Sequence, residues 1–148
     1  MARVTKDRGV VEGYRSGLEE LVSESLKAQG VAFNYEGFPI YYIKPERPSR
    51  YTPDFPLPNG IVVETKGRFV TADRQKHLLV QKQHPDIDIR FVFSRSKTRI
   101  SKTSKTTYAM WCEKHGFKYA DRNIPASWLA EPTNQMSLDA LEKAGVKS

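Results

Sequence analysis

Three charged residues interrupt a part of the sequence whose hydrophobic pattern predicts two paired β-strands. Asp54 lies near the end of a strand expected at 51–55, and Glu64 and Lys66 lie at the end of a strand expected at 61–66. Charged side chains are seldom buried in a sheet unless a partner or a function accounts for them. These three residues are therefore the first candidates for chemistry.

Strand alternation places Glu64 and Lys66 on one face of the expected sheet. The Asn-Gly pair at 59–60, between the two strands, favours a turn and an antiparallel hairpin. If Asp54 pairs opposite Val62, it shares a face with Glu64, and the Cβ atoms of Asp54 and Glu64 lie within about 7 to 8 Å of each other. A slip of one residue in the register would separate the carboxylates.

Two carboxylates at this spacing favour metal-dependent hydrolysis. Buried together without a cation, they would repel each other and one would take up a proton, whereas a hard divalent cation stabilises both in ionised form. Ligands that are all oxygen favour Mg²⁺ or Mn²⁺ over zinc. A neighbouring lysine can orient the attacking water, stabilise charge in the transition state or accept a proton. The implied reaction is attack of water on a phosphodiester.

A structural interpretation of these residues stays open. Asp54 would then be a turn residue, and Glu64 and Lys66 would form an exposed ion pair on an edge strand. Glu19 also has two interpretations, as a site carboxylate or as part of a helix cap. The sequence SGLE at 16–19 fits a capping box, in which the glutamate folds back to the first amide of the helix. For Glu19 the residues alone favour capping.

Composition narrows the class of partner. The chain has 148 residues, with 24 Lys and Arg against 17 Asp and Glu, a formal charge of +7. Its pI is about 9.5, and such a balance favours a polyanion, with nucleic acid first. The length fits one ordinary domain. The single cysteine predicts no internal disulfide and a reducing cytoplasm, and we expect neither a signal peptide nor a membrane-spanning segment.

Apolar periodicity and turn residues predict the elements that position the candidates. Thr71 is expected to cap the second helix, which separates two strands and so predicts a right-handed crossover with those strands parallel. A proline-stiffened connector is expected from residue 44 to residue 49. The expected helices are 17–29, 71–83, 107–115 and 125–128, with a weak one after Pro132, and the expected strands are 31–36, 40–43, 51–55, 61–66 and 87–93.

Basic residues predict where DNA would lie. Between Ile89 and Trp111 the sequence has six basic residues, Arg90 included, and no acidic one, which suits phosphate oxygens. The alternative is a solvated loop that only keeps the protein soluble. The predicted DNA-binding residues are Arg3, Lys6, Arg8 and Arg15 in the N-terminal arm, Arg68, Arg74 and Lys76 after the site, and Arg95, Lys97 and Arg99 in the loop.

Other residues that could do chemistry have plainer explanations. His77 is expected on the surface of its helix. Cys112 and His115 are spaced like zinc ligands, but no second pair lies nearby, so a core position is favoured. The aromatic residues Phe91, Phe93 and Trp128 recur at apolar positions and are expected to pack in the core, not to stack on bases.

Six motifs carry a resemblance that goes beyond a loose site pattern. They are RSGLE at 15–19, YTPDF at 51–55, LPNGI at 57–61, VETKG at 63–67, KHLL at 76–79 and CEKHG at 112–116. In these motifs, spread from residue 15 to about residue 131, the chain resembles the phage endonuclease I family. That family comprises Holliday-junction resolvases of the restriction-endonuclease-like nuclease superfamily.

The resemblance implies a fold and a set of roles. The fold is α/β, a restriction-endonuclease-like core with a mixed β-sheet flanked by helices, in a homodimer that exchanges a β-segment. Asp54 and Glu64 would ligate Mg²⁺ or Mn²⁺ with help from the Thr65 carbonyl, and Lys66 would be the catalytic lysine. Glu19 of one chain would complete the site of the other, and it can cap and catalyse together. The implied substrates are four-way junctions and other branched DNA.

The resemblance also divides the chain. Residues 1–15 are expected to form a flexible basic arm, residues 16–131 the nuclease domain, and residues 132–148 a C-terminal tail. Within the domain, residues 44–50 are the expected bridge between the exchanged halves. The family's tail is lysine-rich, but residues 138–148 here carry acids as well as lysines. Resolving a junction takes two cuts on opposed strands, which a twofold dimer with two sites can supply.

Two other functions fit the residues. One is a repair or restriction-type nuclease that cuts linear duplex, because the same core supports several such reactions. The other is a basic DNA-binding protein without activity, whose carboxylates are structural. In each case the protein would act in the cytoplasm, which is the cytoplasm of the bacterial host if a phage encodes it.

Overall fold

The computed structural model describes residues 17–44 and 47–145. At its centre is a four-stranded sheet in the order β3 (Phe55–Pro56), β4 (Ile61–Lys66), β5 (Asp88–Phe93) and β6 (Lys118–Asp121). The first pair is antiparallel, and the other two pairs are parallel. The mixed sheet, the β3–β4 hairpin and the parallel crossover between β4 and β5 confirm the predicted α/β class.

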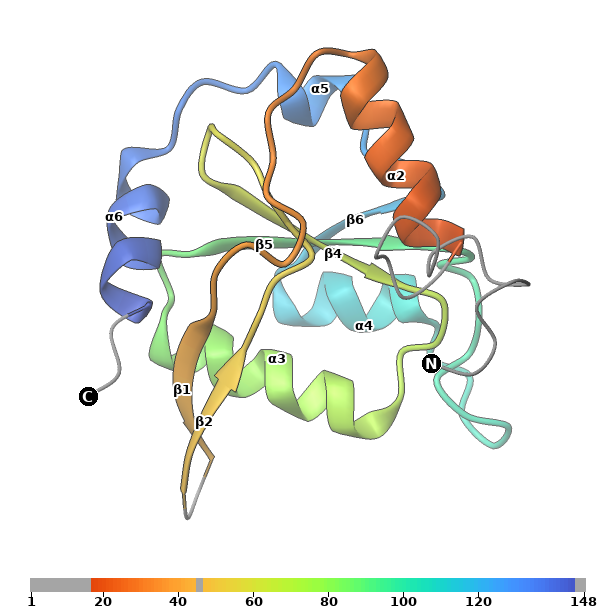
Figure 1. The fold of residues 1–148 in the computed structure, drawn as a ribbon. Helices are drawn as coiled ribbons and strands as arrows, with labels where there is room; N and C mark the ends of the chain where they lie inside the picture. Colours follow the sequence, from red (N-terminus) through yellow and green to blue (C-terminus); the bar gives the residue numbers. More distant parts are fainter. Residues whose placement is uncertain (1–16, 45–46, 146–148) are drawn as a thin grey trace, which may run out of the picture.

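Five helices lie around the sheet in the described part of the chain. They are α2 (Gly17–Ala28), α3 (Thr71–Gln83), α4 (Tyr108–His115), α5 (Ala126–Leu129) and α6 (Gln135–Ala144). Helices α2 and α5 cover one face of the sheet, α3 and α4 cover the other, and α6 packs at one end (Figure 1). None of the helices in the described residues combines the length and the apolar character needed to cross a membrane.

Alternation along β4 divides the core between these layers. Val63 belongs to the cluster beneath α2, with Val22, Leu26 and Phe55. Val62 faces the other way, into the aromatic cluster on the side of α3 and α4 that holds Phe69, Phe91, Phe93 and Trp111. The pleat therefore turns Glu64 toward α3 and Thr65 toward α2. The same clusters confirm that Phe91, Phe93 and Trp128 are packing residues.

Several predicted elements differ from the structure. Residues 31–36 form no strand, and the expected strand at 51–55 is divided between the end of β2 and the two-residue β3. The register pairs Pro56, not Asp54, with Val62. Val70 precedes α3 as its N-cap without a side-chain hydrogen bond, so Thr71 is not the cap. Strand β6 was not predicted because its side chains are mostly exposed or half-buried and show no apolar alternation.

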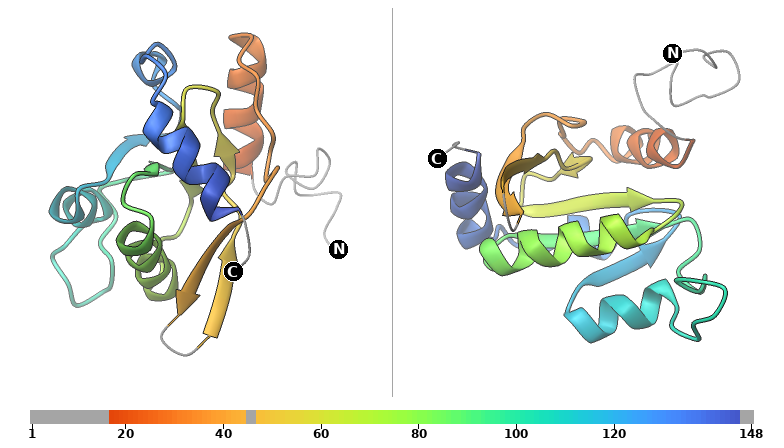
Figure 2. Two further views of the ribbon diagram at one scale, coloured as in Figure 1. Left: turned by 90° about the vertical axis from the view of Figure 1, so that its left-hand side faces the viewer. Right: turned by 90° about the horizontal axis from the view of Figure 1, so that it is seen from below.

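The expected connector is in fact half of a hairpin. Strands β1 (Ile40–Lys44) and β2 (Arg47–Tyr51) pair antiparallel in a separate two-stranded sheet. This β1–β2 hairpin projects from the body beside α3 (Figure 1), and the projection is also clear from the side (Figure 2). Pro48 is compatible with the pairing because it stands on an edge strand, where a missing backbone donor is tolerated.

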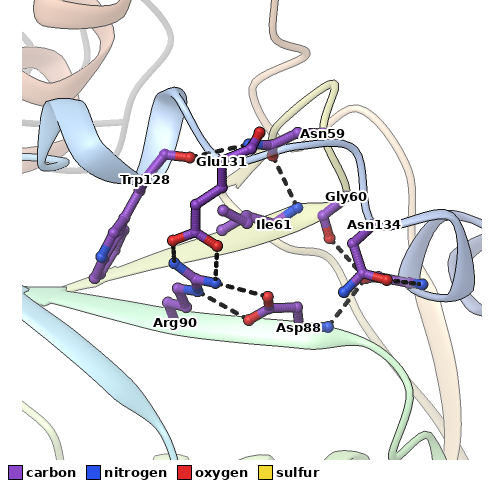
Figure 3. Close-up of polar contacts among 9 residues, drawn as sticks. Asn59, Gly60, Ile61, Asp88, Arg90, Trp128, Glu131 and Asn134 are labelled. Carbon is purple, nitrogen blue, oxygen red and sulfur yellow. Dashed lines mark hydrogen bonds and ion pairs between the residues drawn. The ribbon is translucent and has the colours of Figure 1, made fainter.

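Arg90 holds the C-terminal segment to the sheet. Its guanidinium donates to Asp88 Oδ2 at 2.8 Å and to Glu131 Oε2 at 2.6 Å, and it lies over the Trp128 ring. Figure 3 shows the hydrogen bonds of Arg90 beside the β3–β4 turn. At this turn the Ser137 hydroxyl donates to the Gly60 carbonyl. Arg90 is buried. Its inclusion in a basic phosphate-binding stretch was therefore wrong, because its charge is used within the fold.

Candidate active site

Asp54, Glu64 and Lys66, the three charged residues predicted to form the site, lie near one another at the C-terminal end of β4. Glu64 and Lys66 lie on β4 itself, and Asp54 lies in the bend just before β3. Asp54 is 1% exposed and Glu64 is 3% exposed. The alternative of a turn aspartate beside an exposed ion pair on an edge strand is therefore wrong, because β4 lies between β3 and β5 and both carboxylates are buried.

Asp54 reaches Glu64 by a different geometry from the one expected. Because Asp54 lies outside the strand, its carboxylate accepts hydrogen bonds from the Thr65 backbone N–H at 3.0 Å and the Thr65 hydroxyl at 2.8 Å. Its own backbone N–H donates to Glu64 Oε1 at 3.3 Å. The bend therefore brings the Asp54 backbone within hydrogen-bond distance of Glu64, and the charge of Glu64 is near enough to raise the pKa of Asp54. The two side chains lie toward different layers of the fold.

The proximity of the carboxylates affects their protonation. Burial, together with the charges of Glu64 and Glu19, raises the pKa of Asp54 well above its usual value, although hydrogen bonds from Thr65 oppose the shift. Burial also raises the pKa of Glu64, and the charge of Lys66 opposes that rise. A bound cation would oppose these rises in pKa, because it favours the ionised form of every carboxylate around it.

Lys66 is held as an ammonium between two acids. Its Nζ lies 3.4 Å from Glu64 Oε2 and 3.4 Å from Asp73 Oδ1. Burial would lower the pKa of Lys66, but the charges of Glu64 and Asp73 raise it above its usual value. In this state the lysine is a cation that can face a phosphate oxygen.

Glu19 also lies at this centre. Its Oε1 accepts a 2.5 Å hydrogen bond from the Tyr35 hydroxyl, and its Oε2 accepts a 3.5 Å hydrogen bond from the Thr65 hydroxyl. These contacts come from within one chain. The proposed capping partner, Ser16, lies outside the described residues, so the capping box stays a prediction. Helix α2 thus brings Glu19 to the same threonine that Asp54 contacts.

Glu36 is a further acid at this centre, and it was not among the predicted site residues. Oxygen atoms of Glu19, Glu36 and Asp54 can lie within 4.8 Å of one another, close enough to hold one metal ion. The Glu36 backbone N–H donates to the Asp54 carbonyl at 2.9 Å, and Glu36 has a φ of 48°. The sequence signal was the acid-glycine pair at 36–37, which favours a turn over the expected strand.

The donor set fits a hard divalent cation. The candidate ligands are carboxylate oxygens, and the group includes neither histidine nor cysteine. Mg²⁺ and Mn²⁺ prefer such ligands, whereas zinc sites are richer in nitrogen and sulfur. Cys112 and His115 do not belong to this group. Burial raises the pKa of the Cys112 thiol to about 12, and His115 lies against the Trp111 ring.

His77 is a core residue, contrary to the prediction. It is 0% exposed, and neither ring nitrogen has a hydrogen-bond partner among the described residues. Aromatic rings surround it, with Tyr51 and Phe91 both in edge contact. Burial, followed by the charges of Lys66 and Lys76, lowers the pKa of His77 well below its usual value. The histidine is therefore neutral and apolar in its contacts.

Some of the predicted DNA-binding residues are exposed, and others are half-buried and make contacts within the fold. Arg68, Arg95, Lys97 and Arg99 are exposed. Arg74 is half-buried and donates to the Phe69 carbonyl and the Thr71 hydroxyl at the start of α3. Lys76 is half-buried, and its Nζ lies 3.9 Å from Asp73 and 5.2 Å from the centre of the Tyr51 ring. The four arm residues lie outside the described residues.

Buried carboxylates with an ammonium beside them, at the end of a strand in a mixed α/β sheet, are typical of metal-dependent nucleases. The chain belongs to the phage endonuclease I family, whose family model matches residues 1–147. It is 50% identical over 137 residues to endonuclease I of Escherichia phage T7, a match that covers 93% of this chain and 92% of that protein. It is also 48% identical over 147 residues to endodeoxyribonuclease 1 of Enterobacteria phage T3, covering 99% and 94%. These matches confirm the resemblance seen in the motifs.

Proposed function

We propose that the protein is an endodeoxyribonuclease that resolves four-way DNA junctions, with Mg²⁺ or Mn²⁺ as its cofactor. The observation that carries this proposal is the pair of buried carboxylates, Asp54 and Glu64, with the half-buried Lys66 beside Glu64, in a member of the phage endonuclease I family. Glu19 joins this group through the Thr65 hydroxyl. The two phage relatives are an endonuclease and an endodeoxyribonuclease.

Each residue of the site has a separate task in this proposal. Asp54 and Glu64 hold the cation, with the Thr65 carbonyl as a further oxygen donor. A bound divalent cation would supply Lewis acidity toward the phosphodiester and its attacking water. Lys66 offers a fixed positive charge to the phosphoryl group as negative charge builds up on it. Glu19, which shares the Thr65 hydroxyl with Asp54, completes the carboxylate set.

Basic surfaces would bind the DNA arms. The exposed residues Arg68, Arg95, Lys97 and Arg99 follow the ends of β4 and β5, close in sequence to the site. We assign them, with the arm residues Arg3, Lys6, Arg8 and Arg15, to contacts with phosphates. Phosphate contacts position a nuclease on branched DNA without reading its sequence. Arg74 and Lys76 also make contacts within the fold, and they would contribute positive charge at the edge of the site.

We further propose a homodimer in which the restriction-endonuclease-like cores exchange halves at residues 44–50. The β1–β2 hairpin supports this arrangement because it projects from the body as a separate small sheet (Figure 1). Opening the hairpin between β1 and β2 would leave Glu19 and Glu36 on one side of the exchange and Asp54 and Glu64 on the other. The same contacts would then form between two chains, and each dimer would hold two sites.

The remaining assignments follow from the same proposal. Residues 1–15 would be a basic arm, residues 16–131 the nuclease domain and residues 132–148 a tail. The fold shows that the tail segment includes α6, which packs against the β3–β4 turn through Ser137 and Asn134. Because both relatives are phage proteins, the activity would take place in the cytoplasm of an infected bacterium.

A single substrate comparison tests the function. A four-way junction and linear duplexes with the same arm sequences are incubated with the protein at equal concentration, with Mg²⁺ or with EDTA. We expect paired nicks in the junction that depend on Mg²⁺, and little cutting of the duplexes. Equal cutting of both substrates would indicate a duplex nuclease. Binding without cutting in Mg²⁺ and in Mn²⁺ would indicate a DNA-binding protein.

A further inference from the structure

Tyr51 is a buried residue whose side-chain hydroxyl donates a hydrogen bond to a residue of the site. It is the last residue of β2 and is 3% exposed. Its hydroxyl donates a 2.6 Å hydrogen bond to Glu64 Oε1. Burial, followed by the charge of Glu64, raises the pKa of Tyr51 well above its usual value, so the hydroxyl remains a donor. A hydrogen bond from a neutral donor to a buried carboxylate is short and strong.

Helix α3 holds the Tyr51 ring from the other side. The His77 ring meets it edge-on, with the ring centres 4.8 Å apart. The Lys76 ammonium lies 5.2 Å from the centre of the same ring. The tyrosine is therefore confined between α3 and β4, and His77 and Lys76 of α3 hold its ring from the side opposite Glu64. The buried, neutral His77 therefore supports the site by packing against Tyr51.

The contacts of Glu64 show how much depends on that hydroxyl. Glu64 Oε1 accepts from the Tyr51 hydroxyl at 2.6 Å and from the Asp54 backbone N–H at 3.3 Å. Glu64 Oε2 faces Lys66 Nζ at 3.4 Å. Without the Tyr51 hydroxyl, Oε1 would keep only the longer contact. The carboxylate could then turn toward Lys66, away from the carboxylate of Asp54.

We propose that Tyr51 is a positioning residue, whose hydroxyl holds Glu64 in the orientation in which Glu64 and Asp54 share a cation. The inference rests on the proposed role of Glu64 as a metal ligand. Partners of metal ligands commonly affect affinity because they fix a ligand that would otherwise have several orientations. Tyr51 acts through Glu64 and touches neither the cation nor the DNA. Its effect should therefore be seen first in metal binding and only through that in cleavage.

The test compares Tyr51→Phe with Tyr108→Phe. Tyr108 is also buried, and its hydroxyl accepts a hydrogen bond from the Phe69 backbone N–H, away from the carboxylates. Binding of Mn²⁺ to the DNA-free protein is measured by calorimetry, and junction cleavage is measured over a range of Mg²⁺ concentrations. We expect Tyr51→Phe to weaken Mn²⁺ binding about tenfold. Its cleavage should recover as Mg²⁺ is raised, whereas Tyr108→Phe should match the wild type in both measurements.

Glu64→Gln separates this inference from the proposed function. Wild-type Mn²⁺ affinity in Glu64→Gln would refute the assignment of Glu64 itself, and with it the proposed site. Loss of affinity in Glu64→Gln but not in Tyr51→Phe would overturn the inference about Tyr51 alone. Adding Tyr51→Phe to Glu64→Gln should cause no further loss if the hydroxyl acts through Glu64. A further loss would mean that the tyrosine acts on the fold as a whole, and would also overturn the inference.

Discussion

At the scale of single residues, the site brings together buried carboxylates whose negative charges repel one another. Asp54 and Glu64 are buried beside each other, and Glu19 and Glu36 lie close to Asp54. The Lys66 ammonium lies against Glu64 and is shared with Asp73. Such an arrangement costs stability in the metal-free protein, which is expected of a site organised for a cation rather than for the fold.

The first prediction concerns Asp54→Asn in the metal-free protein. Burial and nearby acids raise the folded-state pKa of Asp54 well above the ordinary 3.8. A carboxyl with a raised pKa stabilises the fold fully below the ordinary pKa, and that stability is lost as the pH rises. The asparagine does not titrate and can still accept from Thr65. Thermal unfolding in EDTA should therefore show that the stability of Asp54→Asn relative to the wild type increases as the pH rises above about 4.

Saturating Mg²⁺ provides the control for this prediction. The cation should raise the melting temperature of the wild type at pH 8 and have little effect on Asp54→Asn, because binding to the folded state is what stabilises it. An advantage for Asp54→Asn that shrinks with rising pH would show that the carboxylate is not strained at neutral pH. The buried Asp54 carboxylate would then not destabilise the metal-free protein.

The second prediction concerns Glu36→Gln. Because Glu36 can place an oxygen near those of Glu19 and Asp54, its loss should weaken Mn²⁺ binding on the order of tenfold. Glu142→Gln is the matched control, since that glutamate is exposed on α6. Calorimetric titration of both variants with Mn²⁺ decides the question. Equal affinity in the two variants would remove Glu36 from the metal site.

At the scale of elements, the sequence was informative wherever apolar periodicity and caps agreed. A helix was expected at 107–115, and α4 spans Tyr108–His115. It begins after Thr107, whose side chain accepts from the Met110 backbone N–H, and it ends at the left-handed Gly116. Strand β4 was equally clear, and the bounds of helix α3 were predicted although its cap was not. Acid and lysine within an otherwise apolar strand were enough to identify Glu64 and Lys66, because a buried charge has few structural explanations.

Tertiary contacts decided the elements that the sequence did not reveal. Residues 31–36 have strand-forming side chains, yet Phe33 and Tyr35 pack on Phe55 instead of pairing in a sheet. The turn that results is what brings Glu36 to Asp54. His77 was misplaced because its neighbours on α3 are mostly polar, so no periodic pattern marks the buried side of the helix. Local propensity cannot predict such contacts between distant segments.

The third prediction concerns the turn that aligns β3 with β4. Gly60 has a φ of 95°, and a Cβ at this position would lie 2.7 Å from the Asn134 carbonyl oxygen. Gly60→Ala should therefore lower the free energy of unfolding by about 1 to 3 kcal/mol. Gly116 has a φ of 77° but nothing within 4 Å of such a Cβ, so Gly116→Ala is the matched control. Its cost should be limited to the backbone term, about 1 kcal/mol.

Urea denaturation of both glycine variants measures these costs. A larger loss for Gly60→Ala than for Gly116→Ala would show that contact with the Asn134 segment adds to the backbone strain. Equal losses would mean that the C-terminal segment moves aside freely. In that case the network around Arg90 and Ser137 (Figure 3) would not hold the turn in place.

At the scale of the whole molecule, the site joins segments from both sides of the β1–β2 hairpin. Glu19 and Glu36 precede the hairpin, whereas Asp54, Glu64 and Lys66 follow it. The chain also carries an excess of positive charge, +7, that suits a DNA partner. A hairpin exchange between two copies would preserve every contact of the site while dividing its residues between the chains.

The fourth prediction tests that division. If Glu19 acts in trans, Glu19→Ala and Asp54→Ala chains should complement each other after they are unfolded and refolded together. The mixed dimer would hold one site lacking both carboxylates and one intact site, so it should nick one strand of a junction but not resolve it. Each variant refolded alone should be inactive. An inactive mixture in which mixed dimers are demonstrated would mean that each site belongs to a single chain.

The most direct test of the central claim measures junction binding and junction cleavage on one preparation of Glu64→Gln. The substitution removes a proposed metal-ligand charge but no proposed phosphate contact. With Mg²⁺, we expect cleavage to fall below detection while the junction affinity in a gel-shift assay stays at or above that of the wild type. Near-normal cleavage, or loss of binding in parallel with loss of cleavage, would contradict a metal-dependent active site built around Asp54, Glu64 and Lys66.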